Sequence, residues 1–66
     1  EQALGHYRKA IELDPEAAAP YCNLGILLAS QGKTDEAVAE FRKALSMDPG
    51  LDVAREKLKE LGADPR

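Results

Sequence analysis

Cysteine is almost absent from this sequence, and aromatic residues are few. Its 66 residues include one cysteine, one phenylalanine, two tyrosines and no tryptophan. One cysteine excludes a disulfide framework, although a chain of this size buries only about 60% of the surface that it exposes when unfolded. The unpaired thiol also favours a reducing compartment such as the cytoplasm, and the sequence leaves the compartment open.

Long runs of one charge or of apolar residues are missing as well. The formal net charge is −3 and the sequence pI is about 5.0, with no stripe of Lys or Arg, so nucleic acid is not the expected partner. The longest apolar stretch, Ile26 to Ala29, is too short to cross a bilayer, and we expect no membrane partner. The chain starts at Glu1 within a helical pattern and without a signal-like segment, so we expect a piece of a longer protein.

The residues that are plentiful indicate helices. Alanine, leucine, glutamate and lysine are common, whereas β-branched residues are scarce. Most of the four prolines and five glycines lie between the apolar patterns, where they indicate turns and helix ends. This composition predicts an all-α chain made of several short helices.

An internal repeat organises the chain. A shift of 34 residues superimposes Ala3 on Ala37, Arg8 on Arg42, Lys9 on Lys43, Ala10 on Ala44, Asp14 on Asp48 and Pro15 on Pro49. The same shift pairs Leu4 with Val38, Tyr7 with Phe41, Ile11 with Leu45 and Leu13 with Met47. Because small and large apolar residues recur in the same order, the match exceeds what two amphipathic helices require.

Periodicity and stop signals predict four helices. They cover about residues 1–13, 16 or 17 to 30, 34–48 and 51–61, with Thr34 as the N-cap of the third. Proline ends the first and third helices, and Gly32 and Gly62 end the others, Gly32 in a left-handed conformation. The predicted inward faces are Ala3, Leu4, Tyr7, Ala10 and Ile11; Tyr21, Leu24, Gly25 and Leu28; Ala37, Val38, Phe41, Ala44 and Leu45; and Leu51, Ala54, Leu58 and Leu61.

These residues resemble the tetratricopeptide repeat, a 34-residue helix-turn-helix unit. The matching positions are Tyr21, Leu24, Gly25, Gly32, Ala37, Phe41, Ala44 and Pro49, with Leu28 in place of the usual tyrosine. The resemblance implies an α-α superhelix of about four antiparallel helices, with Gly25, Ala37 and Ala44 where two helices approach closely. Residues 1–14 would be the second helix of a truncated repeat, 18–51 a complete repeat and 52–62 a polar C-terminal capping helix.

The resemblance also implies a concave groove that binds a peptide or a partner helix. The groove candidates are Ala19, Cys22, Asn23, Ile26, Ala29 and Ser30 on the complete repeat, and Val53, Glu56, Lys57 and Glu60 on the capping helix. Asn23 is the most suggestive of them, because an exposed amide pairs with a peptide backbone as donor and acceptor. The alternative is that it contacts a neighbouring helix.

Other chemistries are poorly supported. Asn23 and Lys57 match two positions of the family's clamp for C-terminal carboxylates, but Ile26 and Val53 stand where that clamp has polar side chains. Cys22 and His6 lack an orienting partner for nucleophilic catalysis, and one His with one Cys cannot complete a zinc site. We therefore expect no enzyme activity in this segment, and no metal or cofactor.

Three roles follow from the sequence. The first is a protein-interaction scaffold, with an unidentified protein or peptide in the groove. The second is a structural module that self-associates through the unpaired N-terminal helix. The third is the regulatory or substrate-presenting arm of a larger enzyme.

Overall fold

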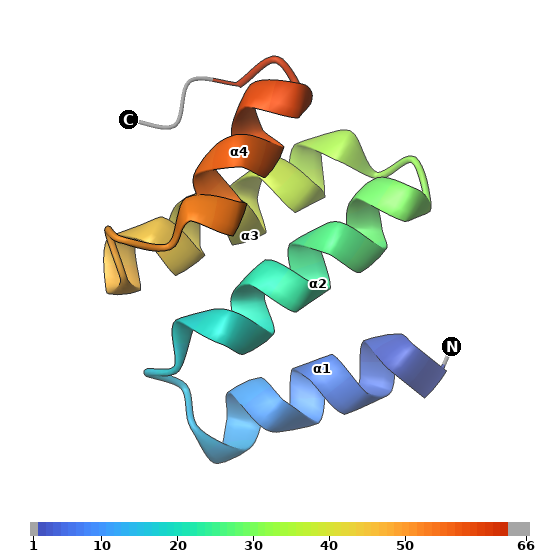
Figure 1. Cartoon of the computed structure of the whole chain (residues 1–66). Helices are drawn as coiled ribbons and strands as arrows, with labels where there is room; N and C mark the ends of the chain where they lie inside the picture. The colour runs from blue at the N-terminus through green and yellow to red at the C-terminus, as the bar shows by residue number, and fades with distance from the viewer. Residues whose placement is uncertain (1, 64–66) are drawn as a thin grey trace.

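The computed structural model describes residues 2–63, and side chains from residue 5 onwards. This part of the chain forms four helices: α1 (Gln2–Leu13), α2 (Ala18–Ser30), α3 (Thr34–Met47) and α4 (Asp52–Glu60). Helix α2 packs most extensively against α3, α1 packs on α2, and α4 packs on α3 with a small contact to α2 (Figure 1). The arrangement is the all-α packing of successive helix-turn-helix units that the sequence predicts.

The turns after α2 and α4 have the same hydrogen-bond pattern. Gly32 has a φ of 79° and Gly62 has a φ of 77°, in the left-handed region that favours glycine. The Lys33 amide donates to the Leu28 carbonyl at 2.9 Å, and the Ala63 amide donates to the Leu58 carbonyl at 2.8 Å. Because these bonds satisfy carbonyls that the helix end leaves open, each glycine stops its helix in a Schellman turn, which confirms the predicted role of Gly32.

The N-cap of α3 lies one residue earlier than predicted. The expected N-cap, Thr34, is already helical, and Lys33 takes the cap position without a side-chain hydrogen bond. The Ala37 amide donates to the Lys33 carbonyl at 3.0 Å, so the first turn of α3 is closed on Lys33. The N-cap prediction was wrong because the Schellman turn leads directly into the next helix.

The core centres on the contact between α2 and α3. Phe41, Ala37 and Ala44 are fully buried, and a Cβ added to Gly25 would lie 2.8 Å from Cε1 of Phe41. Glycine therefore lets the Phe41 ring approach the α2 backbone, as the repeat pattern predicts. The buried apolar residues are Tyr21, Cys22, Leu24, Leu28, Ala37, Phe41, Ala44, Leu45, Ala54 and Leu58.

The ends of the core differ in how well they are covered. Met47 packs on the core, whereas its repeat equivalent Leu13 is 77% exposed. The reason is that α3 packs against both α2 and α4, whereas α1 packs against α2 alone among the helices that the structure describes. Ala3 and Leu4, predicted to face inward, lie outside the residues whose side chains the structure describes.

Gly25→Ala tests the close approach of α2 and α3, and Gly5→Ala is its matched control. Both changes favour a helix by about 0.8–1 kcal/mol. Only the Gly25 methyl group meets the Phe41 ring, since a Cβ at Gly5 has nothing within 4 Å. Overpacking costs about 1–3 kcal/mol, so urea denaturation should show Gly25→Ala less stable than Gly5→Ala by about that amount. Equal stabilities would contradict the packing argument.

Candidate functional site

A hollow of about 300 Å³ lies between α2 and α4, with α3 beneath it. We call it the α2–α4 groove. Its lining residues are Ile26, Ala29 and Ser30 from α2, Phe41 from α3, Lys57 and Glu60 from α4, and Leu61 after α4. Four of these seven side chains are apolar, so the floor of the groove is apolar and its charge lies on α4.

The sequence of α2 explains why one helix can serve both the core and the groove. Leu24, Gly25 and Leu28 share the face that packs inward, at helical spacing. Ile26 and Ser30 share another face four residues apart, and both are exposed. The Ser30 hydroxyl donates to the Leu27 carbonyl at 2.6 Å, which leaves its oxygen still able to accept a hydrogen bond.

The structure brings some of the predicted residues together. Ile26, Ser30 and Lys57 line the α2–α4 groove, as do Ala29 and Glu60. Asn23 is exposed on α2, one turn before Ile26, and Val53 is 52% exposed on α4. Ala19 is exposed near the start of α2, and like Asn23 and Val53 it is not among the residues that line the hollow.

Cys22 differs from the other groove candidates because its side chain is only 5% exposed and belongs to the core. Burial raises the pKa of the Cys22 thiol, and the Lys57 ammonium opposes this by favouring the thiolate. The net result is a thiol that stays protonated near neutral pH. His6 is exposed on α1, whereas Cys22 is buried in the core.

Two residues of the groove were missed by sequence reasoning. Phe41 forms part of the floor although it is fully buried, and Leu61 closes one end from just beyond α4. Both residues belong to the apolar pattern of their helices, and this pattern predicts that they are buried. It does not predict which part of a buried side chain lies beside a hollow. Only the packing of three helices around the groove reveals their position.

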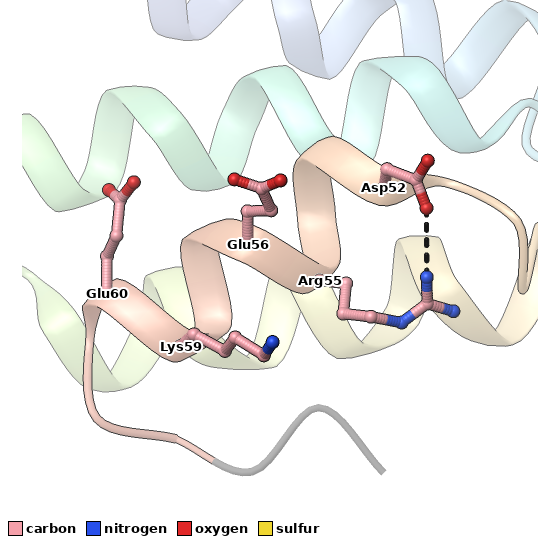
Figure 2. A pocket seen from close by; sticks show the side chains of 5 residues that line it. All are labelled: Asp52, Arg55, Glu56, Lys59 and Glu60. Carbon is pink, nitrogen blue, oxygen red and sulfur yellow. Dashed lines mark hydrogen bonds and ion pairs between the residues drawn. The ribbon is translucent and has the colours of Figure 1, made fainter.

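The exposed face of α4 is ionic. A second, open hollow of about 390 Å³ runs along it and is lined by Asp52, Arg55, Glu56, Lys59 and Glu60 (Figure 2). Arg55 donates to Asp52 at 3.0 Å and also to the Pro49 carbonyl. Arg55 occupies the repeat position of Tyr21, which is a core residue. Through its bonds to Asp52 and Pro49, Arg55 instead stabilises the turn between α3 and α4.

Ion pairs on α4 engage two of its three acidic residues. Besides the Asp52–Arg55 pair, Lys57 Nζ lies 3.5 Å from Glu60 Oε1. All four side chains are well exposed, so each pair is worth about 0.2–1 kcal/mol. Glu56 makes no ion pair or hydrogen bond within the part of the chain that the structure describes.

Within residues 2–63, no three His, Cys, Asp or Glu side chains gather in a way that could hold a metal ion. None of the described helices combines the length and the apolar character needed to cross a bilayer.

Comparison with known proteins finds helical-repeat families. The profile described as "Tetratricopeptide repeat" matches residues 18–51, and one described as "TPR repeat" matches residues 1–32. No solved structure matches the chain significantly.

Curated relatives share nearly two-fifths of their aligned residues with this chain. "Protein STIP1 homolog" of Dictyostelium discoideum is 39% identical over 100% of the chain, but the match covers 10% of that protein. "TPR repeat-containing thioredoxin TTL4" of Arabidopsis thaliana is 38% identical over 91% of the chain and 9% of its own length. "Probable UDP-N-acetylglucosamine--peptide N-acetylglucosaminyltransferase SPINDLY" of Petunia hybrida is 38% identical over 85% of the chain and 6% of its own length. The chain thus spans a tenth or less of each relative.

The raised pKa of Cys22 predicts a loss of stability at alkaline pH. The unfolded thiol ionises at its ordinary pKa of about 8.5, whereas the buried thiol keeps its proton to higher pH. The unfolded state therefore binds fewer protons above this pKa, and the free energy of unfolding falls as pH rises. Urea denaturation should show this decline as the pH rises above about 8.5, and Cys22→Ala should flatten it. An equal decline in both proteins would contradict the assignment.

Proposed function

The chain belongs to the tetratricopeptide repeat family, and we propose that its α2–α4 groove binds a peptide or a partner helix. Repeats of this kind are generally protein-interaction modules. The observation that carries the proposal is the groove itself, an exposed hollow with an apolar floor between two helices of successive units.

The exposure of apolar side chains beside the groove supports binding. Ile26 is 38% exposed and Val53 is 52% exposed, one on each flanking helix. Large apolar side chains on facing elements are typical of surfaces that take up a partner's apolar residues. Asn23, exposed one turn before Ile26, adds an amide that can donate to and accept from a peptide backbone.

The groove does not favour the carboxylate clamp of the family. Lys57 is its one basic lining residue, and this ammonium is paired with Glu60. Ile26 and Val53 bring apolar side chains to the positions that the clamp needs for polar ones. The proposed partner therefore docks through apolar contacts and backbone hydrogen bonds, and its binding is stronger in a longer array of repeats.

Ile26→Glu tests the groove. Peptides selected from a displayed random library against the unmodified chain should bind it and shift backbone amides of α2 and α4 in NMR spectra. A carboxylate in the apolar hollow must be desolvated when a peptide covers it, so Ile26→Glu should weaken binding at least about tenfold. Asn23→Ala should weaken it as well, by removal of the amide.

Ala39→Glu is the matched control, because Ala39 is exposed on α3 and is not among the residues lining the groove. It adds the same charge and should leave peptide binding unchanged. Circular dichroism should show equal helicity in all variants. Full binding by Ile26→Glu would rule out this groove as the peptide site.

A structural role is supported by one separate observation. Leu13 is 77% exposed at the end of α1, the helix that packs on α2 alone. Exposed leucine at an uncovered helix favours contact with a second copy or with a further repeat. We therefore keep self-association through α1 as the second candidate function.

Leu13→Lys tests self-association. If α1 joins two copies, the wild-type chain should show a rise in sedimentation-averaged mass with concentration, and Leu13→Lys should remain monomeric. Because Leu13 is exposed, the change should leave the helicity of the monomer intact. A wild-type chain that stays monomeric at all concentrations would refute this role.

The third role, an arm of a larger enzyme, rests on the relatives. Two of them are named as an N-acetylglucosaminyltransferase and a thioredoxin, and the match covers 6% and 9% of their lengths. In such a parent the repeat segment would present a bound partner to a catalytic domain elsewhere in the protein.

A further inference from the structure

We infer that the α2–α4 groove selects a basic amphipathic segment, with apolar side chains on its floor and Lys or Arg side chains beside α4. This inference rests on the proposed function and adds the chemistry of the partner. It is carried by the distribution of charge around an apolar hollow, and it predicts the opposite charge preference from a carboxylate clamp.

Helix α2 contributes no charge to the groove. Its sequence from Ala18 to Ser30 contains no acidic or basic residue. The lining residues that it supplies, Ile26, Ala29 and Ser30, offer apolar surface and one hydroxyl. The sign of the potential in the groove is therefore set by the opposite wall, α4.

The wall formed by α4 carries a line of carboxylates. Asp52, Glu56 and Glu60 are spaced four residues apart, which puts them on one side of the helix. Figure 2 shows these three side chains projecting from α4 in the same direction, with Arg55 and Lys59 on a different side of the helix. Glu60 also lines the α2–α4 groove, so the line of carboxylates borders it.

Neighbouring cations only partly compensate this line. Helix α4 has as many basic as acidic residues, three of each, but Arg55 and Lys59 lie on a different side from the carboxylates, and Lys57 is the one cation that lines the groove. The pairs Asp52–Arg55 and Lys57–Glu60 are exposed and weak, and they can yield to a partner. Glu56 has no ion pair among the described residues and is ready to accept one.

An occupant must match both features. The apolar floor around Ile26, Phe41 and Leu61 takes an apolar side chain, and burying it provides most of the affinity. An acidic segment would place like charges against Glu56 and Glu60, whereas lysine or arginine beside the anchor meets opposite charge. The surface is thus complementary to a segment that alternates apolar and basic positions.

The experiment uses three peptides with the same leucine positions, in which the remaining residues are lysine, glutamine or glutamate. Their affinities for the whole chain are measured by NMR titration at low salt. The lysine peptide should bind roughly threefold to tenfold more tightly than the glutamine peptide, and the glutamate peptide should bind most weakly. Raising the salt to about 1 M should bring the three affinities together, because exposed charges are then screened.

Glu56→Gln and Glu36→Gln form a matched pair of variants. Both remove one exposed carboxylate, but Glu36 lies in the first turn of α3 and is not among the residues lining the groove. Glu56→Gln should reduce the preference for lysine over glutamine by roughly twofold to fivefold, and Glu36→Gln should leave it unchanged. Equal effects of the two variants would show that net charge, and not the line on α4, governs the preference.

The outcomes separate this inference from the proposed function. If the glutamine and lysine peptides shift the same groove amides with equal affinity, the groove binds peptides but the charge inference is overturned. If none of the peptides shifts those amides, both proposals fail. Amide shifts in the groove that follow protein concentration without any peptide would identify a second copy as the occupant and also overturn the inference.

Discussion

The close contact between Gly25 and Phe41 is the constraint on which the rest of this structure depends. A side chain at Gly25 would collide with the ring, so glycine sets how near α3 comes to α2. Ala37 and Ala44 are fully buried on the same helix as Phe41, where small side chains permit that approach. In a chain with one cysteine and three aromatic residues, this packing must do much of the stabilising that a larger core or disulfides would provide.

The same contact also shapes the candidate site. With α3 drawn close beneath α2, the Phe41 ring becomes both the centre of the core and part of the groove floor. Helix α2 then turns a second, uncharged face outward, where Ile26 and Ser30 lie. Stability and binding are therefore linked at Phe41, and changes there would affect both.

Helix α4 shows how the repeat pattern is altered at one end of the segment. Lys59 stands where Gly25 stands one unit earlier, and Arg55 replaces Tyr21. The Phe41 ring of α3 packs against Gly25 of α2, which has no side chain. A helix packed in the same way on α4 would meet the long side chain of Lys59 at that point. The charged side chain at this position contributes to the ionic exposed face of α4.

The sequence by itself determined the repeat, the order of the helices, the stops at Gly32 and Gly62 and most residues of the core, because helical periodicity and glycine chemistry are local. The resemblance to the repeat family predicted that Ile26, Ser30 and Lys57 lie along a groove, and all three line the hollow between α2 and α4. The tertiary structure decided the remainder: that Lys33 and not Thr34 caps α3, that Cys22 is buried, and that Phe41 and Leu61 help to line the groove. These features depend on how three helices meet, and residues distant in sequence set that geometry together.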